Sequence, residues 1–261
     1  MKISIIIVSW NTRELLEKCL NSIIKNPLYH LTEIFVVDNN SSDASAEMVK
    51  EKFSTVKLIT SDKNLGFAKA NNLALKKATG EYILILNPDT EIFTDTLQQS
   101  IEFMQGNPQC GIMGCKMLFD NNKLQPSVRR FPNFWPIFLM FIKAPKILKN
   151  IKAINNYMAT DFNYEKEQEV DQIMGAYMFT RKEVIDRIGY FDERFFIWFE
   201  EVDLCLRNKK SGWKTMYNPE VTIIHHGGKS FSQQKFITNQ KLFFKSAMKY
   251  FLKNGFSYPK L

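Results

Sequence analysis

Residues 2–10, KISIIIVSW, and residues 12–25, TRELLEKCLNSIIK, place an apolar β-branched run directly before a segment with helical periodicity. The same alternation continues along the first third of the chain. Further strand-like runs lie at 33–38, 56–61 and 81–89, and further helical patterns at 42–53 and 64–78. This alternation predicts an α/β fold with a mostly parallel sheet and right-handed helical crossovers. The carboxyl ends of such strands form a natural ligand crevice.

Length and composition indicate a folded protein rather than a disordered one. With 261 residues, 45% of them hydrophobic, the chain can bury one large core or two closely joined lobes. The N-terminus shows no cleavable signal pattern, so we expect a cytoplasmic protein. The cysteines have neither CxxC spacing nor the density of a secreted scaffold, and we expect reduced, buried thiols without structural zinc at Cys19, Cys110, Cys115 and Cys205.

The formal net charge of +8 is unevenly distributed. Residues 121–160 contain no Asp or Glu but include the apolar run FPNFWPIFLMFI, and no acid follows Glu220, where lysines and aromatics alternate at helical spacing. Both stretches predict peripheral contact with an anionic membrane surface. The alternative is that both are helices that pack on the core and leave their lysines in water. No nucleic-acid-binding motif accompanies the charge, so we expect no nucleic-acid partner.

Polar residues follow the predicted strands at their carboxyl ends. Asp38 can accept hydrogen bonds from a nucleobase or ribose, although a strand-end Asp can equally cap the next helix. No GxGxxG follows the first strand, which argues against a dinucleotide-dependent oxidoreductase. The candidate contacts to a nucleotide sugar are Ser9, Trp10, Asn11, Asp38, Asn64, Asn87 and Asp89.

Asn87-Pro88-Asp89 directly follows the apolar run YILIL. An Asp at this position can supply a hard oxygen ligand to a divalent cation that bridges a diphosphate. Mg2+ or Mn2+ would suit such a ligand. The competing interpretation is an ordinary Pro-Asp turn.

A second polar cluster lies in residues 195–230. Helical geometry places Glu200, Asp203 and Arg207 about one turn apart, with Glu201 in the same first turn. Carboxylates that face a cleft from a helix N-terminus suit a general base. The alternative is an amphipathic surface helix with ordinary ion pairs. Trp198 precedes this helix and is a candidate to stack on a sugar, or else a core residue.

Seven ordered stretches together resemble the inverting nucleotide-sugar glycosyltransferases of family two, which have the GT-A fold, and most closely their rhamnosyltransferase-like branch. They are SIIIVSWNT, FVVDNNSSD, NLGFAKANN, YILILNPDT, IMGAYMFTRKEV, IGYFDERFFIWFEEVDLCLR and IIHHGGKS. The resemblance implies that Asp38 contacts the base, that Asp89 binds the metal and that the pair Glu200 and Glu201 contains the catalytic base. It also implies that His225 reaches the metal or diphosphate, and that Gly175 and Ala176 lie on the acceptor side.

Two positions depart from the family pattern. Asn87 replaces the first acid of the DxD-like motif, so Asp89 carries the metal largely alone. Glu201 replaces the usual Asp of the acidic pair, which leaves the base open between Glu201, Asp203 and Glu200.

The resemblance implies transfer of a sugar to a glycan or lipid-linked acceptor hydroxyl in surface polysaccharide synthesis, with L-rhamnose from dTDP-rhamnose as the expected donor. A UDP-hexose or UDP-N-acetylhexosamine transferase and a non-catalytic binding protein for sugar nucleotides or glycans are the alternatives. We expect a GT-A domain over 1–230, with a nucleotide-sugar-binding half at 1–120 and an acceptor-binding half at 121–230. A basic amphipathic helix is expected over 231–261.

Overall fold

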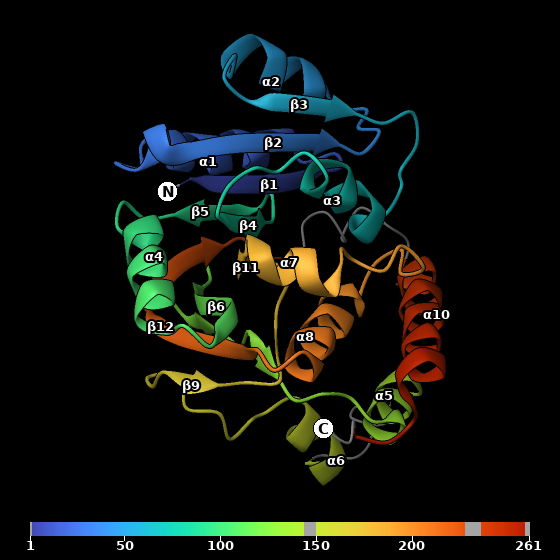
Figure 1. Cartoon of the computed structure of the whole chain (residues 1–261). Coiled ribbons are helices and arrows are strands. Elements are labelled where there is room, and N and C mark those ends of the chain that lie inside the picture. Colours follow the sequence, from blue (N-terminus) through green and yellow to red (C-terminus); the bar gives the residue numbers. More distant parts are fainter. Residues whose placement is uncertain (1, 144–149, 228–235, 259–261) are drawn as a thin grey trace.

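The computed structural model describes residues 2–143, 150–227 and 236–258 (Figure 1). Every strand and helix predicted for the first third of the chain is present, with ends that differ by a few residues. These elements are β1 (Ile3–Ser9), α1 (Arg13–Ile24), β2 (Thr32–Asp38), α2 (Ser45–Lys52), β3 (Lys57–Thr60), α3 (Phe67–Leu75) and β4 (Tyr82–Leu86), with a short 3₁₀ helix, η1 (Tyr29–Leu31), before β2.

The remaining elements range from two-residue strands to the 19-residue helix α10. They are β5 (Thr90–Ile92), α4 (Thr96–Gly106), β6 (Cys110–Leu118), β7 (Leu124–Gln125), β8 (Val128–Arg129), α5 (Phe134–Phe141), α6 (Lys152–Tyr157), β9 (Gln168–Glu169), β10 (Gln172–Ile173), β11 (Tyr177–Arg181), α7 (Lys182–Ile188), α8 (Glu200–Lys210), β12 (Lys214–His225) and α10 (Phe236–Asn254).

The central sheet has the order β3-β2-β1-β4-β11-β6-β12-β5, with β7 beside β6 and β9 beside β12. Strands β3, β2, β1 and β4 are mutually parallel, as predicted. Beyond β4, strands β11 and β5 run in the opposite direction, whereas β6 and β12 run in the same direction as β4. Six of the eight strands in this order thus share one direction, and the expected mostly parallel sheet is confirmed. Strand β11 runs antiparallel to β4, which brings the start of β11 to the edge where β4 ends. A separate two-stranded sheet joins β8 to β10.

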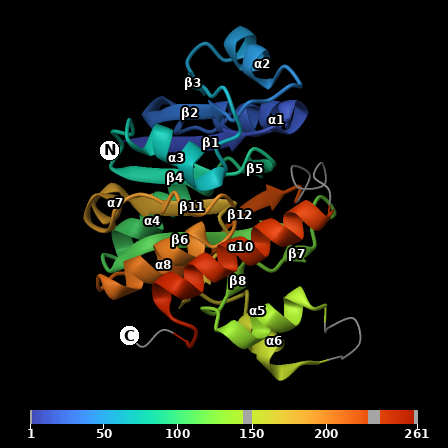
Figure 2. The same cartoon turned by 90° about the vertical axis from the view of Figure 1, so that its right-hand side faces the viewer.

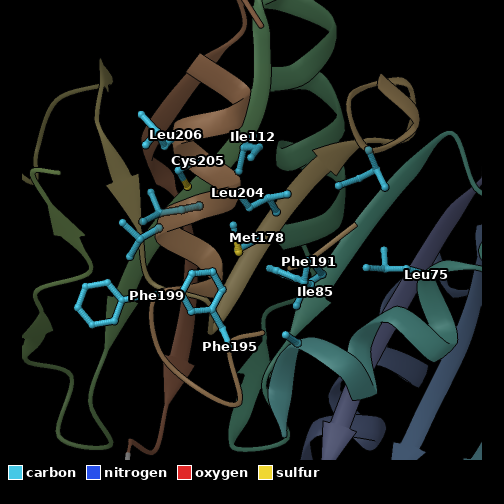
Figure 3. Packing of buried hydrophobic residues seen from close by; sticks show 14 of the residues in the cluster. Leu75, Ile85, Ile112, Met178, Phe191, Phe195, Phe199, Leu204, Cys205 and Leu206 are labelled. Carbon is cyan, nitrogen blue, oxygen red and sulfur yellow. The ribbon is translucent and has the colours of Figure 1, made fainter. Parts of the chain in front are cut away.

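Helices cover both faces of the sheet (Figure 1). In β1 the side chains alternate between two cores, with Ile3, Ile5 and Ile7 in one and Ile6 and Val8 in the other. The first core includes residues of α1, α2 and α4, and the second includes residues of α3, α8 and α10. Burial on both faces explains why β1 reads as a continuous apolar run. Figure 3 shows the second core, where α8 packs over the sheet.

The C-terminal helix α10 packs on the domain. Its residues Ala247, Tyr250 and Phe251 are each about 1% exposed and belong to the second core. Figure 2 shows α10 lying across the C-terminal half of the sheet, with α5 and α6 beyond the sheet edge. The boundary expected near residue 230 lies outside the described residues. All four cysteines are buried and unpaired, as predicted. Among the described helices, none combines the length and apolarity needed to cross a membrane.

Candidate active site

A cleft of about 510 Å³ opens at the edge of the sheet where β1 and β4 end. The structure brings most of the predicted site residues together in its wall. The start of β11 closes one side, because the backbone N–H of Asn87 donates to the carbonyl oxygen of Ala176 at 3.0 Å. The predicted residues that line the cleft are Trp10, Asn64, Asn87, Asp89, Gly175, Ala176, Trp198, Glu200, Glu201 and His225.

The other predicted nucleotide contacts lie just behind the cleft wall. The Ser9 hydroxyl pairs with that of Thr12 at 2.9 Å, and the Asn11 side-chain oxygen accepts from the backbone N–H of Ser42 at 2.7 Å. Asp38 accepts from the backbone N–H of Ser41 at 3.1 Å through one oxygen, while its other oxygen is buried without a partner. These side chains therefore shape the loops after β1 and β2, and Asp38 retains one carboxylate oxygen for a further donor.

Asn39 lines the cleft and was not predicted from the sequence. Its side-chain N–H donates to the Asn64 side-chain oxygen at 2.9 Å, and its own oxygen accepts from the backbone N–H of Leu65 at 2.8 Å. Asn39 thus fixes the loop that follows β3 against the end of β2. Its position next to Asp38 in FVVDNN was the available signal, but two consecutive Asn residues are also typical of a plain turn.

Asp89 and His225 meet across the junction of β5 and β12. The backbone pairs His225 with Thr90, the residue next to Asp89. As a result the Nε2 atom of His225 lies 3.4 Å from the Oδ1 atom of Asp89. Both side chains are about 5% exposed, and Nε2 has no hydrogen-bond partner. The other ring nitrogen, Nδ1, lies 2.8 Å from the Oε1 atom of Gln125, another cleft residue that sequence reasoning missed.

Glu200 and Glu201 begin helix α8 and line the same cleft. Glu200 is 4% exposed, and burial together with the neighbouring negative charge of Glu201 raises the pKa of Glu200 well above its ordinary value. Burial also raises the pKa of Glu201, but the positive charge of Arg129 opposes this shift. Each carboxyl has one oxygen without a hydrogen-bond partner. Arg129, at the end of β8, also lines the cleft and lies in the acid-free stretch of residues 121–160.

Asp203 points elsewhere. It is fully buried, and its carboxylate pairs with Arg207 at 2.9 Å and with Lys253 of α10 at 2.7 Å. It also accepts from the side chain of Asn254 at 3.2 Å. Asp203 therefore ties α8 to α10 and is not part of the cleft wall, which favours the Glu pair over Asp203 as the source of a base.

The entry to α8 is strained. Trp198 and Phe199 have φ angles of 62° and 70°, in the left-handed region that bulky residues rarely adopt. Phe199 is 2% exposed and packs in the second core, which holds the turn in place (Figure 3). Strain of this kind costs about 1–3 kcal/mol per residue and is concentrated at functional sites. It aims Trp198 at the cleft and starts α8 at Glu200.

Two glycines lie near these acids, and one of them allows a close approach between loops. A Cβ atom on Gly66, whose φ is +80°, would lie 2.3 Å from the carbonyl oxygen of Phe196. The backbone N–H of Phe67 donates to that same oxygen at 2.7 Å, so the loop before α3 is fastened to the loop before α8. A Cβ atom on Gly175 would lie 3.8 Å from the Cβ atom of Glu201, which places the predicted acceptor-side glycine against an acid of the pair.

Residues 4–189, well over half of the chain, match the model for Glycosyl transferase family 2. Rhamnosyltransferase WbbL of Escherichia coli (strain K12) is 26% identical over 97% of this chain and 91% of its own length. N-acetylglucosaminyl-diphospho-decaprenol L-rhamnosyltransferase of Mycobacterium tuberculosis is 22% identical over 74% of this chain, which spans 66% of that relative. The mannosyltransferase PcManGT from Pyrobaculum calidifontis, solved with GDP-Man and Mn2+, has a TM-score of 0.60 and 18% identity over 94% of this chain and 69% of its own. The family match and this likeness confirm the expected GT-A fold.

Proposed function

Because the chain belongs to glycosyl transferase family 2, we propose that it moves a sugar from a nucleotide donor to an acceptor hydroxyl with inversion at the anomeric carbon. One observation carries the proposal. A single cleft is lined both by Asp89 and His225 and by the buried acids Glu200 and Glu201. A leaving diphosphate needs a cationic partner and an acceptor hydroxyl needs a base, so the two pairs suit the two ends of one displacement.

Asp89 and His225 fit a divalent cation. Their facing Oδ1 and Nε2 atoms lie 3.4 Å apart, a separation at which two ligands with bonds of about 2.1 Å can share one ion. Among the described residues no third His, Cys, Asp or Glu completes the set. Phosphate oxygens and water commonly complete such sites for Mg2+ and Mn2+. Bound there, the ion would stabilise negative charge on the departing diphosphate.

Glu201 is our preferred base. A general base must be ionised, and burial together with the acidic neighbour Glu201 raises the pKa of Glu200, which disfavours its ionised form. The charge of Arg129 instead favours the ionised form of Glu201. In the proposed reaction the acceptor oxygen attacks the anomeric carbon, the bond from that carbon to the diphosphate breaks, and the hydroxyl proton passes to Glu201. The nucleoside diphosphate leaves with the bonding electrons, so no covalent enzyme intermediate is needed.

The donor half of the cleft is proposed to lie in residues 1–120 and the acceptor half in 121–230. Asp38, Asn39 and Asn64 would then bind the nucleotide, and Gly175 and Trp198 would adjoin the acceptor. The names of the two bacterial relatives support L-rhamnose as the sugar, and the diphospho-decaprenol in one of them supports a lipid-linked acceptor. With this sugar we propose dTDP-rhamnose as the donor and a glycan or lipid-linked acceptor in surface polysaccharide synthesis. A UDP-hexose or UDP-N-acetylhexosamine is the alternative donor.

The direct test measures donor hydrolysis and thermal stabilisation with a panel of dTDP- and UDP-sugars, in Mn2+ and in EDTA. We expect metal-dependent stabilisation and turnover with dTDP-rhamnose. Asp89→Ala should stay folded and lose the metal-dependent response, whereas the exposed control Glu47→Gln should retain it. Glycan binding that survives Asp89→Ala, without turnover of any sugar nucleotide in the presence of candidate acceptors, would instead indicate a binding protein.

We also propose that the protein docks on the cytoplasmic face of an anionic membrane through helix α5. Trp135, in α5, and Ile142, the residue directly after α5, are 65% and 52% exposed, and they are seven residues apart, the spacing of about two helical turns. Residues 121–160 carry seven Lys and Arg and no acid, which complements anionic lipid. By contrast, α10 buries its apolar face in the domain, and its Lys253 pairs with Asp203, so α10 is not proposed as a membrane contact.

Vesicle flotation tests this membrane proposal. The chain should float with phosphatidylglycerol vesicles at low salt and not with phosphatidylcholine vesicles. Trp135→Ser combined with Ile142→Ser should lower the partition at least about tenfold, because large apolar side chains supply much of the binding energy of interfacial helices. Phe93→Ser, which removes an exposed aromatic after β5, is the control and should bind like the wild type. Equal flotation of all variants, or none by the wild type, would exclude docking through α5.

A further inference from the structure

We propose that Gln125 is a positioning residue that holds His225 in the tautomer able to bind a divalent cation, an inference that rests on the metal site proposed above. The Oε1 atom of Gln125 lies 2.8 Å from the Nδ1 atom of His225. An amide oxygen can only accept a hydrogen bond, so Nδ1 carries the hydrogen. A neutral imidazole has one N–H group, and Nε2 is therefore left with a free lone pair.

A carboxylate oxygen of Asp89 lies close to the nitrogen that carries this lone pair. Nε2 is buried without a hydrogen-bond partner and lies 3.4 Å from the Oδ1 atom of Asp89. Neither a carboxylate nor an unprotonated ring nitrogen can donate, so two electron-rich atoms face each other in a desolvated place. A cation resolves this conflict. The opposite tautomer would place an N–H group against Asp89, where the resulting hydrogen bond would compete with the cation for both atoms.

The fold limits how far Gln125 can move. Gln125 is 9% exposed, and its backbone pairs with Met117 in the β6–β7 hairpin. This pairing fixes the position of the Gln125 Cα atom from which the side chain extends. The turn of the hairpin is fastened separately by His226, whose Nδ1 lies 2.5 Å from Asp120 and whose Nε2 lies 2.7 Å from Glu91. The side chains of adjacent residues in an extended chain point in opposite directions. The His225 side chain therefore lines the cleft, whereas the His226 side chain binds the hairpin turn.

The experiment compares Gln125→Met, which keeps the length but removes the acceptor, with Gln125→Glu, which keeps an acceptor. Two readouts are used on each folded variant. The tautomer of His225 is read from ring ¹⁵N NMR shifts of the metal-free protein, with His225→Gln used to assign its signals among the three histidines. The affinity for Mn2+ alone is read by EPR titration of the free ion.

We expect the wild type and Gln125→Glu to show hydrogen on Nδ1, and Gln125→Met to show it on Nε2. Mn2+ affinity should fall about 10- to 100-fold in Gln125→Met and stay within a few-fold of wild type in Gln125→Glu, because partners of metal-bound histidines typically contribute that much. Gln125→Asn withdraws the acceptor by one methylene. It should behave like Gln125→Met and replaces that variant if the Met side chain prevents folding.

The two proposals fail in different ways. If the wild type binds Mn2+ but Gln125→Met keeps both its affinity and the wild-type tautomer, the role of Gln125 is wrong while the metal site stands. If the wild type does not bind Mn2+ and His225→Gln changes nothing, the metal site itself is wrong, and the inference is overturned with it.

Discussion

Neutralising Asp203 should damage stability and spare chemistry, although this residue belongs to the same acidic helix as the proposed base. In Asp203→Asn the guanidinium of Arg207 and the ammonium of Lys253 both lose a carboxylate that is fully buried. Removing one partner of a buried ion pair typically costs about 3–5 kcal/mol. The side chains of Arg207 and Lys253 are 20% and 24% exposed and can turn to water, so we expect the low end, about 3 kcal/mol.

Urea unfolding followed by circular dichroism measures this loss directly. For a chain of this size about 3 kcal/mol corresponds to a fall in Tm of about 6–12 °C. Turnover per folded molecule, measured at a temperature below the transition, should stay within a few-fold of wild type. The exposed control Glu47→Gln should change neither quantity. An Asp203→Asn protein with wild-type stability and a loss of turnover above about 1,000-fold would refute the reasoning and restore Asp203 as a candidate base.

Three further predictions address other parts of the molecule. Burial raises the pKa of Glu33, but hydrogen bonds from Lys57 and other donors lower it more, so its ionised form stabilises the fold above its ordinary pKa of 4.5. Glu33→Gln should therefore cost about 1.5–3 kcal/mol at pH 7 by urea unfolding, and the difference should shrink as the pH falls below about 4.5; a constant difference would be inconsistent with this account. Gly66→Ala should destabilise the chain by about 2–3 kcal/mol in the same assay, because its φ is positive and the new methyl would meet Phe196; a neutral effect would contradict the geometry. Since the pKa of Glu201 is raised, kcat/KM should fall on the acid side with a midpoint above 4.5, and a flat profile down to that pH would rule out Glu201 as the base.

The first four strands could be predicted because short stretches of sequence specify each strand and each helix between them. Strands β1, β2 and β4 are buried on both faces and appear in the sequence as apolar runs, and the helices between the strands show clear periodicity. The direction of β11 was not predictable in this way. Its pairing with β4 joins residues 91 to 99 positions apart, and nothing in the five residues Tyr177–Arg181 encodes the partner.

The same limit applies within the site. Asp89, His225 and the Glu pair could be found because they stand in motifs with known spacing. Gln125 and Arg129 come from short strands with no motif, and their role depends on which side chains the fold brings beside them. Helical spacing places Asp203 one turn from Glu200, and the sequence therefore suggested a third acid in the cleft. The structure shows instead that Asp203 pairs with Lys253, 50 residues later in the chain, and lies outside the cleft wall.

The most direct test of the central claim is to compare donor binding with turnover in Glu201→Gln. The amide has the shape of the acid but cannot take a proton, so dTDP-rhamnose with Mn2+ should bind within a few-fold of wild type. Transfer to the acceptor should fall by about 100- to 10,000-fold. Full turnover by Glu201→Gln, with donor binding intact, would contradict the assignment of this cleft carboxylate as the base.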